Sequence, residues 1–190
     1  MGFEFFKINT KINIMKTNFF TTITIVATLI FSSSVFAQLD GPILNGLDNT
    51  SEYKTIELIN MDRDLSTFAN LLTLSGLNLS LALNTEPHTL FVPTNEAFSK
   101  MSIKRFVELT NPRNKTKLTK FMNDHFLTKK YTSREFKNAD VISTGFNTKI
   151  EIFQDDYYLS FGGAKVLQAD IQSNNGMIFI VDGFIEPSRY

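Results

Sequence analysis

Apolar residues recur at helical spacing in the first half of the chain and alternate with polar residues in the second half. The three-to-four spacing predicts helices over residues 51–60 and 64–75, around 103–107 and around 118–125. From Val141 onward the period becomes two, which predicts strands at 150–152, 157–161 and 177–181, among others. Helices followed by strands indicate an α+β fold.

Turn and cap residues set the expected element boundaries. Asp64 can cap the second helix and Gly76 ends it, while Pro112 stops the third. Thr132 and Glu135 have the spacing of a capping box. For residues 77–83, where leucines alternate with other residues, periodicity alone predicts a strand.

The segment from His88 to Phe98 predicts a buried strand that runs directly into a helix. Residues 88–92 are β-compatible, and Pro93 removes a backbone donor, so a central strand cannot continue through it. Thr94 then suits an N-cap, with Glu96 in the first turn. Asn175-Gly176 predicts a hairpin with a type I′ turn before the last apolar strand.

The N-terminus is typical of a secretory signal peptide. Lys16 precedes an apolar run from Phe19 to Phe31, which ends in small residues at Val35-Phe36-Ala37. This run is shorter than the roughly 20 residues that span a bilayer, so we expect no transmembrane anchor. Residues 1–37 are the expected leader, with Met15 as an alternative start, and 38–50 a flexible lead-in.

Composition narrows the function classes. Removing the leader takes three lysines and one glutamate from 19 basic and 19 acidic residues, which leaves 16 and 18 and a formal charge of −2. This near-neutral charge gives no long-range positive potential that would attract nucleic acid. The basic segment 113–120 is interpreted as a solvated helix face. The chain has no cysteine, so a secreted domain must be held by its core alone.

Four segments resemble a known family. The string TLFVPTNEAF at 89–98 is similar to the first signature of the fasciclin domain, an extracellular adhesion module, and 173–187 is similar to the second, about 80 residues later. Residues 61–72 resemble the family's opening helix and 163–166 one of its strands. The resemblance covers most of the chain after the leader.

The resemblance implies a single fasciclin-like domain over residues 51–190, a β-sandwich or wedge with helices packed around it. It also implies a short helical turn at 77–83, which leaves helix and strand as open alternatives there. We expect the apolar runs 90–92 and 178–181 to pair in the core. The structural signature residues are Thr94, Asn95, Phe98, His125, Asn175, Gly176 and Asp182.

Candidate chemistry is sparse. His125 lies on an apolar helix face, which favours a hydrogen-bonded core histidine, and in the family this histidine braces the fold, here against the Thr94-Asn95 turn. His88 is expected to be partly exposed. Asp155-Asp156 is interpreted as a turn, and Asp62 and Asp64 as capping acids. No catalytic, metal-binding or cofactor-binding residue is predicted, and Asp182 is expected to bond backbone near the strand end.

The resemblance implies a secreted or cell-surface, non-catalytic module that binds an extracellular protein or glycan; it sets neither the partner nor the oligomeric state. The alternative is a carrier of an apolar ligand such as a lipid or carotenoid, since 12 phenylalanines follow the leader. Asp124 and Phe179 replace family residues, and no Arg-Gly-Asp occurs, so integrin binding is not carried over. Sequons at Asn49, Asn78 and Asn114 are interpreted as chance matches.

Overall fold

The computed structural model divides the chain into two units, Met1–Gly41 and Pro42–Tyr190. It describes residues 43–188 apart from 84, 137–138, 145–147 and 156, so every element named below belongs to the second unit. The predicted leader 1–37, the alternative start at Met15 and residues 38–42 of the lead-in lie outside the described residues.

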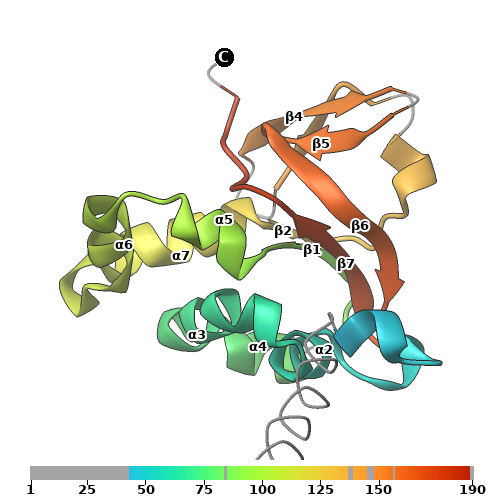
Figure 1. Ribbon diagram of the computed structural model, residues 1–190, viewed down its shortest axis with the longest axis horizontal. Coiled ribbons are helices and arrows are strands. Elements are labelled where there is room, and N and C mark those ends of the chain that lie inside the picture. The colour runs from blue at the N-terminus through green and yellow to red at the C-terminus, as the bar shows by residue number, and fades with distance from the viewer. Residues whose placement is uncertain (1–42, 84, 137–138, 145–147, 156, 189–190) are drawn as a thin grey trace, which may run out of the picture. The chain divides into compact units, whose positions relative to one another are not determined.

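Helices dominate the first part of this unit and strands the second, which confirms the α+β class (Figure 1). The helices are η2 (Ile43–Gly46), η3 (Thr50–Glu52), α2 (Thr55–Met61), η4 (Arg63–Leu65), α3 (Ser66–Ser75), α4 (Leu77–Leu83), α5 (Asn95–Ser99), α6 (Ile103–Thr110), η5 (Pro112–Asn114), α7 (Lys115–Asp124) and η6 (Ser133–Phe136), where η marks a 3₁₀ helix. The strands are β1 (His88–Pro93), β2 (Phe126–Leu127), β3 (Val141–Ser143), β4 (Lys149–Gln154), β5 (Leu159–Phe161), β6 (Ala164–Gln172) and β7 (Gly176–Val181).

The described strands form one seven-stranded sheet in the order β2-β1-β7-β6-β5-β4-β3. Strands β1 and β7 pair in parallel from His88↔Gly176 to Pro93↔Val181, whereas the other neighbours are antiparallel. The expected pairing of the two apolar runs is therefore confirmed.

Strands β1 and β7 are buried along their whole length because each face of the pair packs against a different core. Leu90 and Ile178 join a cluster with helices α2, α3 and α7, whereas Phe91 and Phe179 join a cluster with β4 and β5. In Figure 1, helices α2, α3 and α4 lie on one side of this pair and β4 and β5 on the other. Burial on both faces explains why these strands are continuously apolar.

Several helix boundaries differ from the sequence prediction. Of the two alternatives left open for residues 77–83, the structure has the helix that the resemblance implies, α4, and not the strand that periodicity predicts. Leu81 is buried while Leu79 is 64% exposed, a division that a strand face would not give. The helix predicted over 51–60 begins only at Thr55. Asp62, not Asp64, caps the next segment by accepting from the Asp64 N–H at 2.9 Å.

Other predicted boundaries hold. Gly76 ends α3 in the left-handed conformation, with φ of 83°. Helix α6 ends before Pro112 as expected, but Ile103 and Val107 on it are 83% and 55% exposed, so the apolar spacing located the helix without locating its buried face. The expected flexible lead-in is partly structured, because Ile43–Gly46 form a 3₁₀ helix and Leu44 is only 3% exposed.

The last hairpin forms by a different turn from the one predicted. Strands β6 and β7 pair up to Gln172↔Met177, and the Ser173 N–H donates to the Gly176 carbonyl at 3.0 Å. A type I′ turn is ruled out because neither Asn175 nor Gly176 has a positive φ. Both residues are buried, so they serve contacts made across the domain.

Candidate functional site

The first signature fixes the corner between β1 and α5 and also holds helix α3. Thr94 caps α5 by accepting from the Ala97 N–H at 3.2 Å. The Asn95 side chain accepts from the Thr67 N–H at 2.9 Å and donates to the Arg63 carbonyl at 2.8 Å. Asn95 therefore supplies a capping bond to the first turn of α3, a contact that connects residues about thirty positions apart and that local sequence patterns cannot show.

Phe98 belongs to an aromatic group under the same corner. It is 7% exposed, and its ring centroid lies 5.1 Å from that of Phe184 and 6.4 Å from that of Phe121. The side chain thus packs α5 against α7 and the segment after β7.

The second signature begins in a buried polar network. Asn175, 6% exposed, accepts from the Thr55 N–H at 3.0 Å and donates from Nδ2 to the Leu81 carbonyl at 3.1 Å. Thr55 and Ser173 hydroxyls lie 2.7 Å apart in the same network. Asn175 therefore links the β6–β7 connection to helices α2 and α4, and Thr55 and Ser173 are residues that the sequence analysis missed.

His88 is part of this network and is buried, at 1% exposure, so the expectation of partial exposure was wrong. Its Nδ1 lies 3.1 Å from the Glu86 carbonyl, an acceptor, so Nδ1 carries the proton and Nε2 accepts from the Thr55 hydroxyl at 3.0 Å. Burial lowers the pKa of His88, which keeps the ring neutral.

Gly176 is required by the proximity of His88. A Cβ at this position would lie 2.8 Å from the His88 carbonyl oxygen and 2.9 Å from Cδ2 and Nε2 of its ring. The glycine therefore permits close approach of β7 to His88, which is a different reason from the turn conformation expected from sequence.

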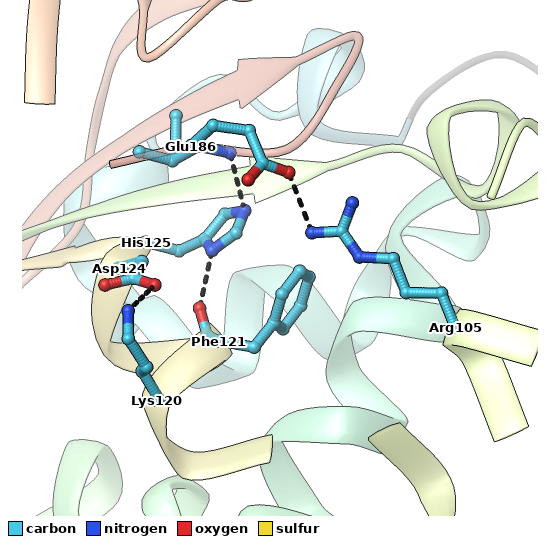
Figure 2. Close-up of polar contacts among 7 residues, drawn as sticks. Arg105, Lys120, Phe121, Asp124, His125 and Glu186 are labelled. Atoms are coloured by element: carbon cyan, nitrogen blue, oxygen red, sulfur yellow. Dashed lines mark hydrogen bonds and ion pairs between the residues drawn. The ribbon is translucent and has the colours of Figure 1, made fainter. Parts of the chain in front are cut away.

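His125 occupies the centre of a second buried site, shown in Figure 2. Its side chain is fully buried; Nδ1 donates to the Phe121 carbonyl at 2.7 Å, and Nε2 accepts from the Ile185 N–H at 3.2 Å. Burial lowers the pKa of His125 to about 4, so the ring is neutral near pH 7. The imidazole braces α7 against the segment after β7, and these two bonds replace the expected contact with the Thr94-Asn95 turn.

Two ion pairs flank His125 in Figure 2. Arg105 pairs with Glu186 at 2.7 Å, and Lys120 pairs with Asp124 at 2.8 Å. Asp124, where the family has a tyrosine, is 6% exposed, and its Oδ1 has no hydrogen-bond partner within the described ranges.

Asp182 ends β7 as the sequence predicts. Its Oδ1 accepts from the Lys165 N–H at 2.8 Å, and its own N–H donates to the Lys165 carbonyl at 3.0 Å. The carboxylate thus closes the β6–β7 pair at the end opposite Asn175.

A concave pocket opens beside the first signature. Its volume is about 390 Å³, and three of its lining residues are acidic. The lining residues are Asp62, Asp64, Leu65, Thr94, Asn95, Glu96, Leu167, Gln168 and Ile180. Asp62 is 2% exposed, and its Oδ2 has no hydrogen-bond partner in the described part of the chain.

The described residues contain no group of three or more His, Cys, Asp or Glu side chains placed to hold a metal ion. Within the same residues, no helix has both the length and the apolar character needed to cross a bilayer. Asp155 accepts from the Tyr157 and Tyr158 N–H groups at 2.8 and 2.9 Å, as a turn aspartate does; Asp156 lies outside the described residues.

The chain is similar to several known proteins. Protein sll1483 of Synechocystis is 31% identical over 123 residues, which cover 64% of this chain and 68% of that protein. Human periostin is 29% identical over 136 residues, 70% of this chain but 16% of periostin. Heme ligase of Plasmodium falciparum is 28% identical over 152 residues, 67% of this chain and 73% of that protein.

A solved structure shares the fold. The FAS1 domain pair of the insect cell adhesion molecule fasciclin I aligns with a TM-score of 0.54 and 19% identity, covering 72% of this chain and 51% of the pair. The family model of the fasciclin domain matches residues 63–187, from η4 to the segment after β7. The chain therefore belongs to the fasciclin domain family.

Proposed function

We propose that this protein is a secreted, non-catalytic interaction module that binds an extracellular protein or surface glycan. The observation that carries the proposal is that the signature side chains are engaged within the domain. Asn95, His125 and Asn175 each bond backbone groups of other elements or segments. Recognition then falls to exposed surface held in place by this scaffold.

The carrier alternative has less support. Five phenylalanines among the described residues are fully buried, and four of them, Phe91, Phe136, Phe161 and Phe179, pack against one another with ring centroids 4.5–5.9 Å apart. These rings fill a core, and no aromatic side chain of the described residues lines the acidic pocket beside Thr94. The relatives that suggest adhesion, periostin and fasciclin I, are much longer than the part of them that this chain matches.

The test uses protein secreted by its native host. Mass spectrometry of the N-terminus shows whether the leader is removed, and the absorption spectrum of an organic extract shows whether a lipid or carotenoid is bound. Labelled protein is then titrated against the host's surface fraction, untreated or treated with protease or glycosidase. We expect a ligand-free protein and saturable binding that one treatment abolishes. A stoichiometric apolar ligand without surface binding would contradict the proposal.

A further inference from the structure

The pocket beside the first signature combines negative charge with apolar walls. Asp62, Asp64 and Glu96 supply carboxylates, while Leu65 and Leu167 supply aliphatic surface, and among the described residues no lysine or arginine lines it. Leu167 is 56% exposed although it is apolar. A volume of about 390 Å³ lies within the roughly 300–1,000 Å³ typical of small-ligand sites.

Asp62 distinguishes this pocket from an ordinary acidic surface. One carboxylate oxygen, Oδ1, accepts from the Asp64 N–H at 2.9 Å. The other, Oδ2, is buried without a partner among the described residues, although the residue lines the pocket. An unpaired buried carboxylate oxygen is unfavourable, and a cation beside it would remove that cost.

Among the neighbouring polar side chains, Asn95 cannot serve Asp62, because its oxygen and both amide hydrogens are already used. Thr94 accepts from the Ala97 N–H, and Asn95 uses its oxygen and its amide on helix α3 and η4. Glu96 pairs with Lys100 at 2.9 Å, but both side chains are largely exposed, so this pair can exchange at little cost.

The arrangement selects among cations. The described part of the chain contains no cluster of three side chains that could ligate a metal ion. A bidentate arginine fork engages both oxygens of one carboxylate, and Oδ1 of Asp62 already accepts from the Asp64 N–H. A lysine ammonium is a compact charge with three donors, and its aliphatic stem can lie along Leu65 and Leu167.

We propose that this pocket receives a lysine side chain of a partner protein, with the ammonium beside Asp62 and the stem on the apolar wall. The proposal deepens the interaction function proposed above and rests on it. It places recognition on exposed Glu96 of the first signature and on residues beside that signature from η4 and β6.

The probe is a blocked tripeptide with a central lysine, titrated into the ¹⁵N-labelled secreted chain and followed by NMR. We expect saturable shifts of the amides of residues 62–65 and 94–96, and no such shifts with the norleucine tripeptide. Asp62→Asn should weaken binding about tenfold, the effect of losing one charge-assisted contact. The double variant Asp64→Asn with Glu96→Gln changes only exposed carboxylates at the pocket rim, so it should keep the fold and also weaken binding. The matched control is Glu151→Gln, at an exposed position on β4.

Four results would overturn the proposal: no shifts; equal shifts with norleucine; tighter binding of the arginine tripeptide; or competition by millimolar Ca²⁺ or Mg²⁺ at these amides. The surface-fraction titration separates the two proposals. If the double variant Asp64→Asn with Glu96→Gln still binds the surface fraction, the lysine site is refuted and the interaction function stands. If the wild-type protein does not bind the surface fraction, the interaction function is refuted whatever the peptide result.

Discussion

Replacing Gly176 by alanine tests the physical reason for the second signature. The new Cβ would lie 2.8 Å from the His88 carbonyl oxygen and 2.9 Å from two atoms of its ring. Ordinary contacts between heavy atoms are about 3.5–4.0 Å, so the neighbours must move by roughly 0.6–1.2 Å. They cannot move freely, because β1 and β7 are paired at this position and the ring is hydrogen-bonded at both nitrogens.

Overpacking of this kind costs about 1–3 kcal/mol in the free energy of unfolding. For a domain of about 150 residues each kcal/mol lowers Tm by about 2–4 °C, so we expect Gly176→Ala to lower Tm by about 2–12 °C. The assay is thermal unfolding followed by circular dichroism, with urea unfolding to obtain the free energy.

Gly183→Ala is the matched control. Its Cβ would lie 3.6 Å from the nearest atoms, both of Ala164, and its φ is outside the left-handed region. This substitution should be neutral or stabilising by up to about 1 kcal/mol, because alanine restricts the unfolded chain. If Gly176→Ala is as stable as Gly183→Ala, the close approach of His88 to β7 is wrong.

Four further predictions concern the other buried contacts and the leader. His125→Ala should lower the free energy of unfolding by roughly 1–3 kcal/mol, and a variant that melts like the wild type yet loses partner binding would make His125 a contact residue. Because the pKa of His125 is lowered to about 4 in the fold, the unfolded chain alone takes up a proton between about pH 6.5 and pH 4. The free energy of unfolding should therefore be highest above pH 6.5 and fall by about 3 kcal/mol towards pH 4. The lowered pKa of His88 should add to this fall. In urea titrations at several pH values, His125→Gln should flatten the profile. Asn95→Ala should cost about 0.5–2 kcal/mol through loss of a capping bond, whereas exposed Glu96→Ala should change little, and equal Tm values would refute the role of Asn95. Export should remove residues 1–37, and an intact segment 19–31 in the mass spectrum of secreted protein would refute the signal peptide.

The sequence predicts most of the helices and strands because local signals identify them. Thr94 caps α5 and Gly76 ends α3 through contacts within a few residues. The continuous apolar character of β1 and β7 also predicts their burial on both faces. For residues 77–83, periodicity alone predicts a strand, because leucines two positions apart occur in both helices and strands. Only the packing in the folded domain distinguishes the two.

The contacts of the candidate site depend on partners distant in sequence. Asn175 meets Thr55 across 120 positions, and His125 meets Ile185 across 60. His88 was expected to be a partly exposed residue at the start of a strand. In the structure helix α2 covers it, and the Thr55 hydroxyl forms a hydrogen bond with its Nε2. Nothing local marks Asp62 as buried either, since a capping aspartate usually leaves its second oxygen in water.

The central claim is that the buried signature residues build the scaffold while exposed residues, Glu96 among them, recognise the partner. The most direct test is the affinity for the host's surface fraction, measured below the melting transition, for Gly176→Ala and for the double variant Asp64→Asn with Glu96→Gln. The account predicts that Gly176→Ala binds like the wild type despite its lower Tm, and that the double variant loses binding at an unchanged Tm. Loss of binding by folded Gly176→Ala, with full binding by the double variant, would contradict it.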